Sequence, residues 1–331
     1  MPPEMIAAVM ETPNAPLQLR RVPVPVLAPG EVLVATRTTG ICGTDLHILD
    51  GHGYLPSLPH ILGHEPAGVV AEVGSGVEGF QSGDRVIAHL FFSCGECPYC
   101  TAGCEQQCCR LKGILGVLSP GAMAQYFKVP ARNLFRLPDE IDFASGGLIA
   151  DAVLTSVHAA HRGAVPPGAS AVVVGAGGVG LCLIQVLLAS GVQVAVWDRS
   201  PAKLEMARLL GAATLDPDRP AEAGRIFDCV GSRDSLANAC RWAAPCGRVV
   251  VIGEHGDSLG VTSTEIAQRE LEIIGSRNGT RQELTEAVRY VATGAVRPPI
   301  AARFPLHEVN AALELVRRGA AGRVVLEINP A

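Results

Sequence analysis

Residues 171–190 read AVVVGAGGVGLCLIQVLLAS, a pattern of an apolar run, a glycine-rich turn and a second apolar run that indicates the fold of the second half of the chain. A short apolar run predicts a buried strand, GAGGVG at 175–180 predicts a tight turn, and the apolar residues after it predict a helix. Glycines between a strand and a helix let a pyrophosphate approach the backbone and the free N–H groups of the helix N-terminus. The candidate cofactor-binding residues of this turn are Gly175, Gly177, Gly178, Val179 and Gly180. A glycine-rich turn without a ligand is the alternative interpretation.

The next predicted strand, over 192–197, ends at Asp198. A carboxylate at this place accepts hydrogen bonds from the ribose hydroxyls of adenosine and repels a 2′-phosphate, so the sequence favours NAD over NADP. Arg199 follows directly and keeps NADP open as the less favoured cofactor, because a basic side chain can accommodate that phosphate.

Further strand patterns at 226–230, 248–252 and 271–274 alternate with helical patterns, which predicts a parallel, doubly wound sheet. The first half, to about residue 149, has short β-type runs at 31–36, 68–73 and 85–88, separated by Gly and Pro signals. It is predicted to be a mostly-β lobe. In the tail we predict a helix over 307–318 and a strand over 323–328, and the pattern does not assign them to either lobe.

The chain has 331 residues, a length that favours two domains. Lysine plus arginine number 27 against 32 aspartate plus glutamate, so the net charge of −5 disfavours a nucleic-acid or anionic-membrane partner. Residues 163–197 lack charge and are long enough for a bilayer, but seven glycines and a Pro-Pro pair interrupt them, as in a buried strand and helix. The N-terminal residues show no basic or sustained apolar export signal, so we expect a cytoplasmic protein.

Six of the eleven cysteines lie in one short segment. Cys94, Cys97, Cys100 and Cys108 have the spacing of a closed, tetrahedral Zn²⁺ site, and a cluster of free or redox thiols is the alternative. Cys104 and Cys109 are read as bystanders, although Cys109 could replace Cys108. The segment carries no basic patch, which argues against a nucleic-acid-binding zinc ribbon. Outside it, apolar surroundings predict inert core thiols at Cys182, Cys229, Cys240 and Cys246.

A third group of residues combines GICGTDLH at 40–47 with GHE at 63–65. A thiolate at Cys42 and an imidazole at His64, with carboxylates nearby, are the ligand types of an open zinc site. Taken alone, a single cysteine and a few histidines are more often structural.

These motifs, in this order, resemble the medium-chain zinc-dependent alcohol dehydrogenase family. The resemblance rests on GICGTDLH, GHEPAGVVAEVGSGVEGFQSGDRV, the four-cysteine loop, GAGGVG, Asp198 and the closing GRVVLEI, and it covers almost the whole chain. It implies an α/β fold, with a doubly wound Rossmann domain at 151–297 and a mostly-β, GroES-like catalytic domain at 1–150 and 298–331. It also implies two zinc ions per chain, NAD(H), a small-molecule alcohol or carbonyl substrate, and a homodimer or homotetramer.

The resemblance also implies roles for single residues. Cys42 and His64 correspond to the first two ligands of the catalytic zinc and Glu65 to a carboxylate beside it. Asp151 takes the place of the third ligand, and a solvated helix cap is the competing interpretation. Thr44 corresponds to the residue that hydrogen-bonds the alcohol and His47 to the one that passes its proton to solvent, while Arg323 corresponds to a pyrophosphate contact.

The expected activity is hydride transfer between a primary or secondary alcohol, or its carbonyl, and a nicotinamide cofactor. A polyol, sugar or amino-alcohol dehydrogenase of the same family is one alternative. A catalytically silent zinc protein that senses NAD is another.

Overall fold

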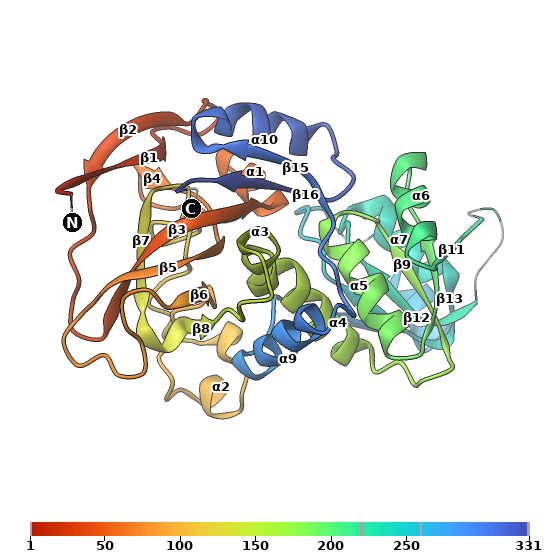
Figure 1. Cartoon of the computed structure of the whole chain (residues 1–331). Helices are drawn as coiled ribbons and strands as arrows, with labels where there is room; N and C mark the ends of the chain where they lie inside the picture. The colour runs from red at the N-terminus through yellow and green to blue at the C-terminus, as the bar shows by residue number, and fades with distance from the viewer. Residues whose placement is uncertain (1, 217, 219–221, 259, 330–331) are drawn as a thin grey trace. The chain divides into compact units, whose positions relative to one another are not determined.

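The structure is a computed structural model that describes residues 2–216, 218, 222–258 and 260–329 (Figure 1). The chain divides into two compact units, the first formed by Met1–Asp151, Thr280–Val288 and Ile300–Ala331 and the second by Ala152–Gly279 and Arg289–Pro299. Helix α9 (Arg281–Ala292) and the π-helix η3 (Ile149–Val153) cross from one unit to the other along the chain. The domain limits expected from the sequence, 1–150 with 298–331 and 151–297, remain a prediction.

Two sheets form the first unit. An antiparallel sheet has the order β2-β1-β4, and a seven-stranded sheet has the order β15-β16-β3-β5-β6-β8, with β7 also paired to β3. Their strands are β1 (Glu4–Met10), β2 (Gln18–Pro23), β3 (Glu31–Ile41), β4 (His60–Ile61), β5 (Glu65–Val73), β6 (Arg85–Ala88), β7 (Tyr126–Pro130), β8 (Leu134–Arg136), β15 (Ile300–Pro305) and β16 (Arg323–Glu327).

Strand β3 is the centre of this unit because it pairs with β5, β7 and β16. Its side chains Val32 and Val34 are fully buried in a core that also contains Val86 and Phe127. β16 pairs antiparallel with β3, with Val324 opposite Ile41, so the C-terminal strand belongs to the first unit. The sequence pattern did not assign the tail to either lobe, and this pairing assigns its strand to the first unit.

Short helices join these strands. Helix α10 (Val309–Arg317) places Val309, Ala312 and Leu313 on one buried face, at the spacing of an amphipathic helix. The helical segments of the first unit are α1 (Gly43–Leu49), α2 (Pro98–Thr101), η1 (Glu105–Gln107), η2 (Ala131–Asn133), α3 (Phe143–Gly147), η4 (Leu306–Glu308) and α10 (Val309–Arg317).

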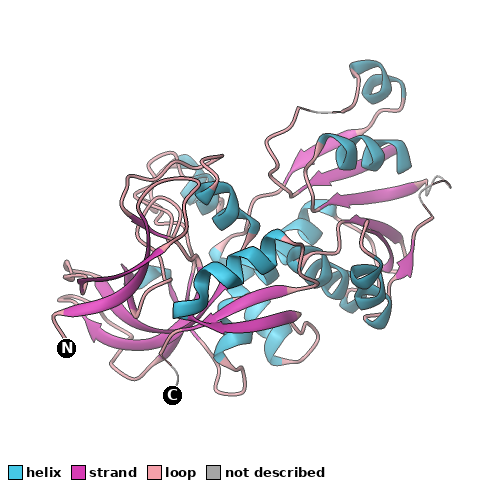
Figure 2. Ribbon diagram, turned by 90° about the horizontal axis from the view of Figure 1, so that it is seen from above, coloured by secondary structure: helices cyan, strands magenta, loops and turns pink. Residues whose placement is uncertain are grey.

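The second unit contains one parallel sheet with the order β11-β10-β9-β12-β13-β14. Strands are drawn in magenta and helices in cyan in Figure 2. Counted along the chain, this is the order 3-2-1-4-5-6 of the Rossmann fold. The strands are β9 (Ser170–Val174), β10 (Gln193–Trp197), β11 (Ala213–Thr214), β12 (Ala223–Asp228), β13 (Ala243–Val251) and β14 (Glu272–Gly275). The helices are α4 (Leu154–Gly163), α5 (Gly178–Ala189), α6 (Pro201–Leu209), α7 (Arg233–Trp242) and α8 (Ser263–Gln268).

Helices cover both faces of the parallel sheet. Val173 of β9 packs in one core with Leu183 of α5, while its neighbour Val172 packs in another core with Leu236 of α7. Since both faces are buried, every residue of the strand can be apolar, which explains the run AVVV.

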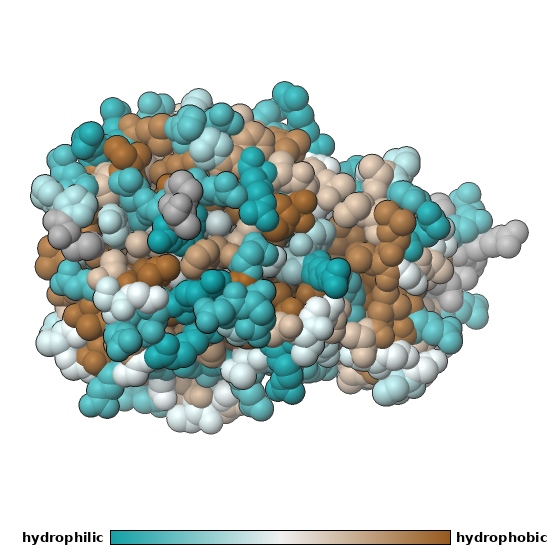
Figure 3. All heavy atoms as spheres, viewed as in Figure 1, coloured by the Kyte–Doolittle hydropathy of each residue, from teal (hydrophilic) through white to brown (hydrophobic). Residues whose placement is uncertain are grey.

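The parallel Rossmann sheet and the mostly-β first unit confirm the fold class predicted from the sequence. Of the four predicted core thiols, Cys182 and Cys240 are buried and Cys229 is only partly buried. The prediction for Cys246 is wrong: it is exposed, because it lies at a positive-φ position (φ 58°) where β13 is irregular. On the face shown in Figure 3, hydrophilic and hydrophobic residues are interspersed. Among the residues that the structure describes, no helix combines the length and apolar character of a membrane span.

Candidate active site and metal centres

Cys42 lies at the junction between strand β3 and helix α1. The Asp45 carboxylate accepts the backbone N–H of Cys42 at 2.8 Å, and this contact caps the helix as it begins. The thiol of Cys42 is half-buried, and its Sγ lies 3.7 Å from the Thr44 hydroxyl oxygen. The turn therefore presents a thiol and a hydroxyl group side by side.

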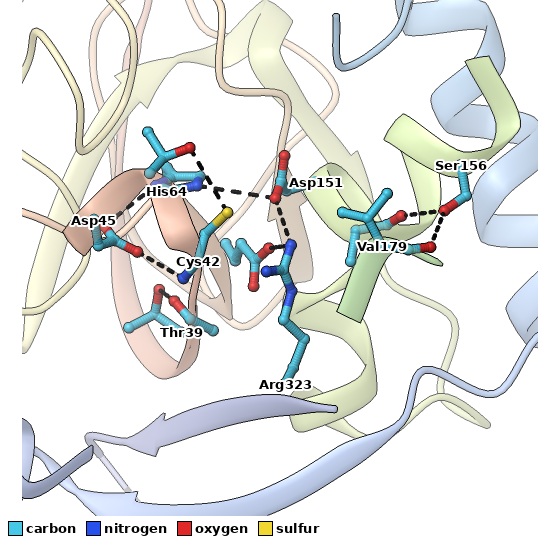
Figure 4. Close-up of polar contacts among 12 residues, drawn as sticks. Thr39, Cys42, Asp45, His64, Asp151, Ser156, Val179 and Arg323 are labelled. Carbon is cyan, nitrogen blue, oxygen red and sulfur yellow. Dashed lines mark hydrogen bonds and ion pairs between the residues drawn. The ribbon is translucent and has the colours of Figure 1, made fainter. Parts of the chain in front are cut away.

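His64 precedes strand β5 and is 3% exposed. Gly63 before it has φ 98°, and a Cβ there would meet the backbone N of Met123, so only glycine suits this turn. The imidazole Nδ1 of His64 lies 3.3 Å from Asp45, and its Nε2 lies 3.9 Å from Asp151 (Figure 4). Asp45 thus orients the ring so that Nε2 is the nitrogen that can bind a metal ion.

Asp151 lies in the π-helix η3, between buried apolar residues. Wide helical turns of this kind occur frequently at functional sites. The side chain of Asp151 is 13% exposed, and the N-cap of the following helix α4 is Val153. The interpretation of Asp151 as a solvated helix cap is therefore wrong, because its carboxylate points to His64 and Arg323.

Cys42, His64, Glu65 and Asp151 form one cluster in the first unit. Each offers one ligand atom, and these atoms all lie within 4.8 Å of one another. Two nitrogen or oxygen ligands about 2.1 Å from a tetrahedral zinc ion are about 3.4 Å apart. The His64 Nε2 and Asp151 carboxylate oxygen lie 3.9 Å apart, somewhat more than this distance.

The cluster buries more acidic than basic groups. Arg323 lies 2.7 Å from Glu65 and 2.9 Å from Asp151, and it supplies one positive charge for both. Burial and the charge of Asp151 raise the pKa of Glu65, although Arg323 opposes this shift. For Asp151, burial raises the pKa, but the Glu65 hydrogen bond and the charges of His64 and Arg323 hold it well below its usual value. Burial raises the pKa of the Cys42 thiol, but Arg323 and His64 lower it by more, so that the pKa lies below its usual value.

This donor set suits a divalent cation. Together with Arg323, the charge of such a cation would neutralise buried thiolate and carboxylate groups that are otherwise costly to hold away from water. Thiolate, imidazole and carboxylate are the ligand types of catalytic zinc, and three of them leave a position open for substrate. Cys42, His64 and Asp151 therefore fit a catalytic zinc ion, with Glu65 beside it.

The cysteine loop forms a second, closed cluster of Cys94, Cys97, Cys100 and Cys108. The Sγ–Sγ distances are 3.4 Å for Cys97–Cys100 and 3.9 Å for both Cys94–Cys100 and Cys97–Cys108. A tetrahedron of sulfurs about 2.3 Å from one ion has edges of about 3.8 Å, so these distances fit zinc.

Backbone N–H groups support the thiolates of this loop. The N–H of Cys97 donates to Cys94 Sγ, and the N–H of Cys94 donates to Cys108 Sγ, both at 3.3 Å. A backbone hydrogen bond in the loop also lowers the pKa of Cys97 to about 5, while burial raises that of Cys100 to about 12. Cys104 and Cys109, both exposed, are not among the four clustered thiols.

The glycine-rich turn follows β9 in the second unit. Gly175 has φ 94°, and a Cβ at Gly180 would overlap the carbonyl of Gly175. The conformation and the close packing of the backbone in the turn therefore require these two glycines. Gly177, the N-cap of α5, is different: a Cβ there would meet no described atom within 4 Å. Open space at this glycine is what the backbone approach of a pyrophosphate requires.

Neighbouring side chains hold this turn in place. Asp198 accepts the N–H groups of Ala176 and Ser200, both at 2.8 Å, so it fixes the turn and still has lone pairs for a ribose. Gly178 opens helix α5, and the carbonyl of Val179 accepts the Ser156 hydroxyl. Arg199 beside Asp198 is exposed.

Two residues of the GICGTDLH motif have roles at the first site that the sequence did not indicate. Asp45 contacts both Cys42 and His64, and its position three residues after Cys42 was the available signal for a capping box. Gly40 is required because a Cβ there would overlap the Glu65 carboxylate, and no sequence pattern indicates this contact. Arg323, expected to contact a pyrophosphate, binds the carboxylates of Glu65 and Asp151.

Comparisons with known proteins agree with these sites. Residues 28–139 match the family model of the alcohol dehydrogenase GroES-like domain, and residues 178–293 match that of the zinc-binding dehydrogenase. An alcohol dehydrogenase of Geobacillus stearothermophilus is 33% identical, over 98% of this chain and 100% of the relative. L-galactonate-5-dehydrogenase of Escherichia coli (strain K12) is 32% identical over 84% of each chain.

Solved structures are similar over nearly the whole length. Acetophenone reductase from Geotrichum candidum, in complex with NAD, has a TM-score of 0.93 and 29% identity, covering 99% of this chain and 98% of its own. A cobalt- and zinc-bound thermostable alcohol dehydrogenase from Pyrobaculum aerophilum has a TM-score of 0.91 and 30% identity, covering 98% and 99%.

The matched domains and the two cysteine-containing clusters define an oxidoreductase of the zinc-binding dehydrogenase class. The chain belongs to the medium-chain zinc-dependent alcohol dehydrogenase family. The resemblance found in the sequence is thereby confirmed.

Proposed function

We propose that this chain transfers a hydride between a primary or secondary alcohol, or its aldehyde or ketone, and NAD(H). One observation carries the proposal: Cys42, His64 and Asp151 cluster in a chain that also has a glycine-rich turn with open space at Gly177. Zinc held by the three side chains would supply Lewis acidity toward the substrate oxygen, and NAD would supply the hydride acceptor. NADP(H) is less favoured because of Asp198.

The chain's own residues position these groups and move the proton. Asp45 fixes the tautomer and the ring orientation of His64, and Arg323 neutralises the carboxylates behind the cluster. Thr44 and His47 are three residues apart on α1 and so share one face of the helix. Thr44 would hydrogen-bond the substrate hydroxyl, and the half-buried imidazole of His47 would pass its proton to solvent.

The four-cysteine loop is proposed to hold a second, structural zinc ion, because four thiolates leave no open position. A cytoplasmic location and a homodimer or homotetramer are also part of the proposal. In support of an oligomer, β14 is the end strand of the parallel sheet, and end strands can pair with a second copy.

A polyol or sugar-type alcohol is the second candidate substrate class. It is favoured by the 32% identity to L-galactonate-5-dehydrogenase and by the 31% identity to a 2-dehydro-3-deoxy-L-galactonate 5-dehydrogenase of Pseudoalteromonas atlantica. The two candidates share the site and differ only in the substrate.

The test is NADH formation, followed by absorbance, across simple alcohols, polyols, sugar acids and amino alcohols. We expect at least one substrate to reduce NAD⁺, and the Cys42→Ser variant to lose roughly a thousandfold in kcat/KM. Cys104→Ser, which removes an exposed thiol outside both clusters, is the matched control and should keep the parent rate. A metal-loaded parent that binds NAD but oxidises no alcohol would instead support the silent NAD-sensing class.

A further inference from the structure

Ser156 of helix α4 places a buried hydroxyl against two backbone carbonyl groups. The residue is 0% exposed. Its Oγ lies 2.7 Å from the carbonyl oxygen of Ala152 and 3.0 Å from that of Val179 (Figure 4). All three residues belong to the second unit. A hydroxyl has one proton to donate, so the two carbonyl oxygens share it.

The two carbonyls belong to different segments. Ala152 lies in η3, four residues before Ser156, and a hydroxyl contact over this distance is common within helices. Val179 lies in the first turn of α5, 23 positions away, so the second contact joins α4 to α5. Ser156 therefore holds the start of α5 from outside the glycine-rich turn.

Packing alone does not require a hydroxyl at this position. Other buried side chains of the two helices are apolar, such as Leu154 and Val157 on α4 and Leu183 on α5. Alanine would keep the carbon atom that packs among them and lose only the oxygen. A buried hydroxyl is costly unless it is hydrogen-bonded, and here both partners are backbone carbonyls. The contribution of Ser156 is therefore its hydrogen bond.

The first turn of α5 is the part of the cofactor site whose position matters most, because its free N–H groups are the donors for a pyrophosphate. Two other contacts hold this turn. A Cβ at Gly180 would overlap the carbonyl of Gly175, so the backbone packs closely there. The carboxylate of Asp198 accepts the N–H of Ala176. The hydroxyl of Ser156 adds a contact at the following turn of helix.

We infer that Ser156 is a positioning residue for the cofactor, which fixes the first turn of α5 in the place where its N–H groups receive the pyrophosphate. This inference rests on the NAD binding of the proposed function. Ser156 acts through Val179, since its own side chain is buried. Without the hydroxyl, the turn has to be ordered when the cofactor binds, and that ordering lowers affinity.

The experiment measures dissociation constants for NAD⁺, ADP-ribose and adenosine by calorimetry on the zinc-loaded chain, with adenosine measured by displacement. We expect Ser156→Ala to weaken NAD⁺ and ADP-ribose by the same factor, about threefold to tenfold, which is the effect of one hydrogen bond. Adenosine should bind as it does to the parent, because it has no pyrophosphate. Ser156→Thr retains the hydroxyl and should restore the affinity for NAD⁺.

Ser190→Ala is the matched control. Ser190 is the C-cap at the other end of α5, and its Oγ also donates to a carbonyl four residues earlier, that of Val186, at 2.9 Å. This variant loses the same kind of hydrogen bond from the same helix, far from the glycine-rich turn. It should bind all three ligands like the parent.

The parent is measured first, so that failure of the proposed function and failure of the inference are distinguishable. A zinc-loaded parent that binds no NAD⁺ would contradict the proposed function. A Ser156→Ala variant with the parent affinity for NAD⁺ and ADP-ribose, or one that weakens adenosine equally, would overturn the role of Ser156 alone. Thermal unfolding identifies any variant that fails to fold. If Ser156→Thr does so, the contrast between Ser156→Ala and Ser190→Ala decides the question.

Discussion

Gly40 shows how closely one residue controls the metal site. It lies on β3, two residues before Cys42, and a Cβ there would overlap the Glu65 carboxylate and the side chain of Leu148. We expect Gly40→Ala to lower zinc content and to destabilise the first unit by about 1–3 kcal/mol through overpacking. Metal analysis and thermal unfolding measure both effects.

The control for this change is Gly43→Ala, where a Cβ would meet no described atom within 4 Å. It should bind zinc like the parent. Equal zinc content in the two variants would show that the space beside Glu65 is not critical.

Asp45 is the residue that the metal ligands depend on most directly. Its carboxylate contacts the N–H of Cys42, the N–H of Gly63 at 3.3 Å and Nδ1 of His64. Removing such an outer partner typically costs 10–100-fold in metal affinity, so we expect Asp45→Ala to weaken zinc binding by about that factor. Competition with a chelator of known affinity measures it.

A carboxylate control with polar contacts of its own is available elsewhere in the first unit. Asp84 accepts the N–H of Gln81 and pairs with Arg136, and its side chain is only 12% exposed. Asp84→Ala should leave zinc affinity unchanged. If Asp45→Ala kept the parent affinity as well, the orienting role of Asp45 would be refuted.

For single residues of the metal site, the sequence predicted which side chains could bind a metal ion better than which side chains contact one another. Cys42, His64 and Asp151, which the structure brings together, carry the chemistry of a metal ligand in their side chains. Asp45 resembles an ordinary acid in the first turn of a helix, and its contact with His64 depends on the pairing of β3 with β5. A local sequence motif does not indicate a contact that depends on the pairing of distant strands.

At the scale of elements, one ion pair joins the helix that carries Thr44 and His47 to the C-terminal helix. Arg317 of α10 donates to both carboxylate oxygens of Asp50, which caps the end of α1, at 2.7 and 2.8 Å. The hydrogen bond from Arg317 lowers the pKa of Asp50, although burial opposes the shift. We expect Asp50→Asn to cost about 0.5–1 kcal/mol at pH 7, because the pair is partly exposed.

The sign of this effect with pH follows from the lowered pKa. The stabilisation is complete above the unfolded pKa of about 3.9 and is lost as the pH falls through the lower folded value. Urea unfolding at pH 7 and near pH 3 should therefore show the difference between the parent and Asp50→Asn shrinking in acid. Glu314→Gln is the control, since it breaks the pair between Glu314 of α10 and Arg318, the C-cap of the same helix. A difference for Asp50→Asn that grew in acid would contradict the assignment.

The presence of the strands could be predicted from the sequence more reliably than the residues at which they end. The strand predicted at 85–88 agrees with β6, and all five strands predicted from 171 to 274 are present in the parallel sheet. The strand predicted at 31–36 continues to Ile41, because β5 and β16 pair with its second half. Polar residues such as Thr38 and Thr39 conceal that extension, since hydrogen-bonded pairing and not hydropathy keeps them in the strand.

At the scale of the whole molecule, the chain combines a donor cluster in one unit with a dinucleotide-type turn in the other. The motifs predicted both features because each is local in sequence. The local pattern did not assign the tail, which only the family resemblance placed with the first domain, since the pairing of β16 with β3 joins residues nearly 290 positions apart. The substrate is the part of the function that neither local motifs nor the fold specify.

The presence of one open and one closed zinc site is tested by the zinc content of the purified chain, prepared without chelators and measured by elemental analysis. The parent should contain about two zinc ions per chain, one in the closed site and one in the open site. Cys42→Ser and Cys100→Ser should each contain about one, because each change removes a ligand of a different cluster. A parent with one zinc ion or none, or a Cys42→Ser variant that retains both, would contradict the claim.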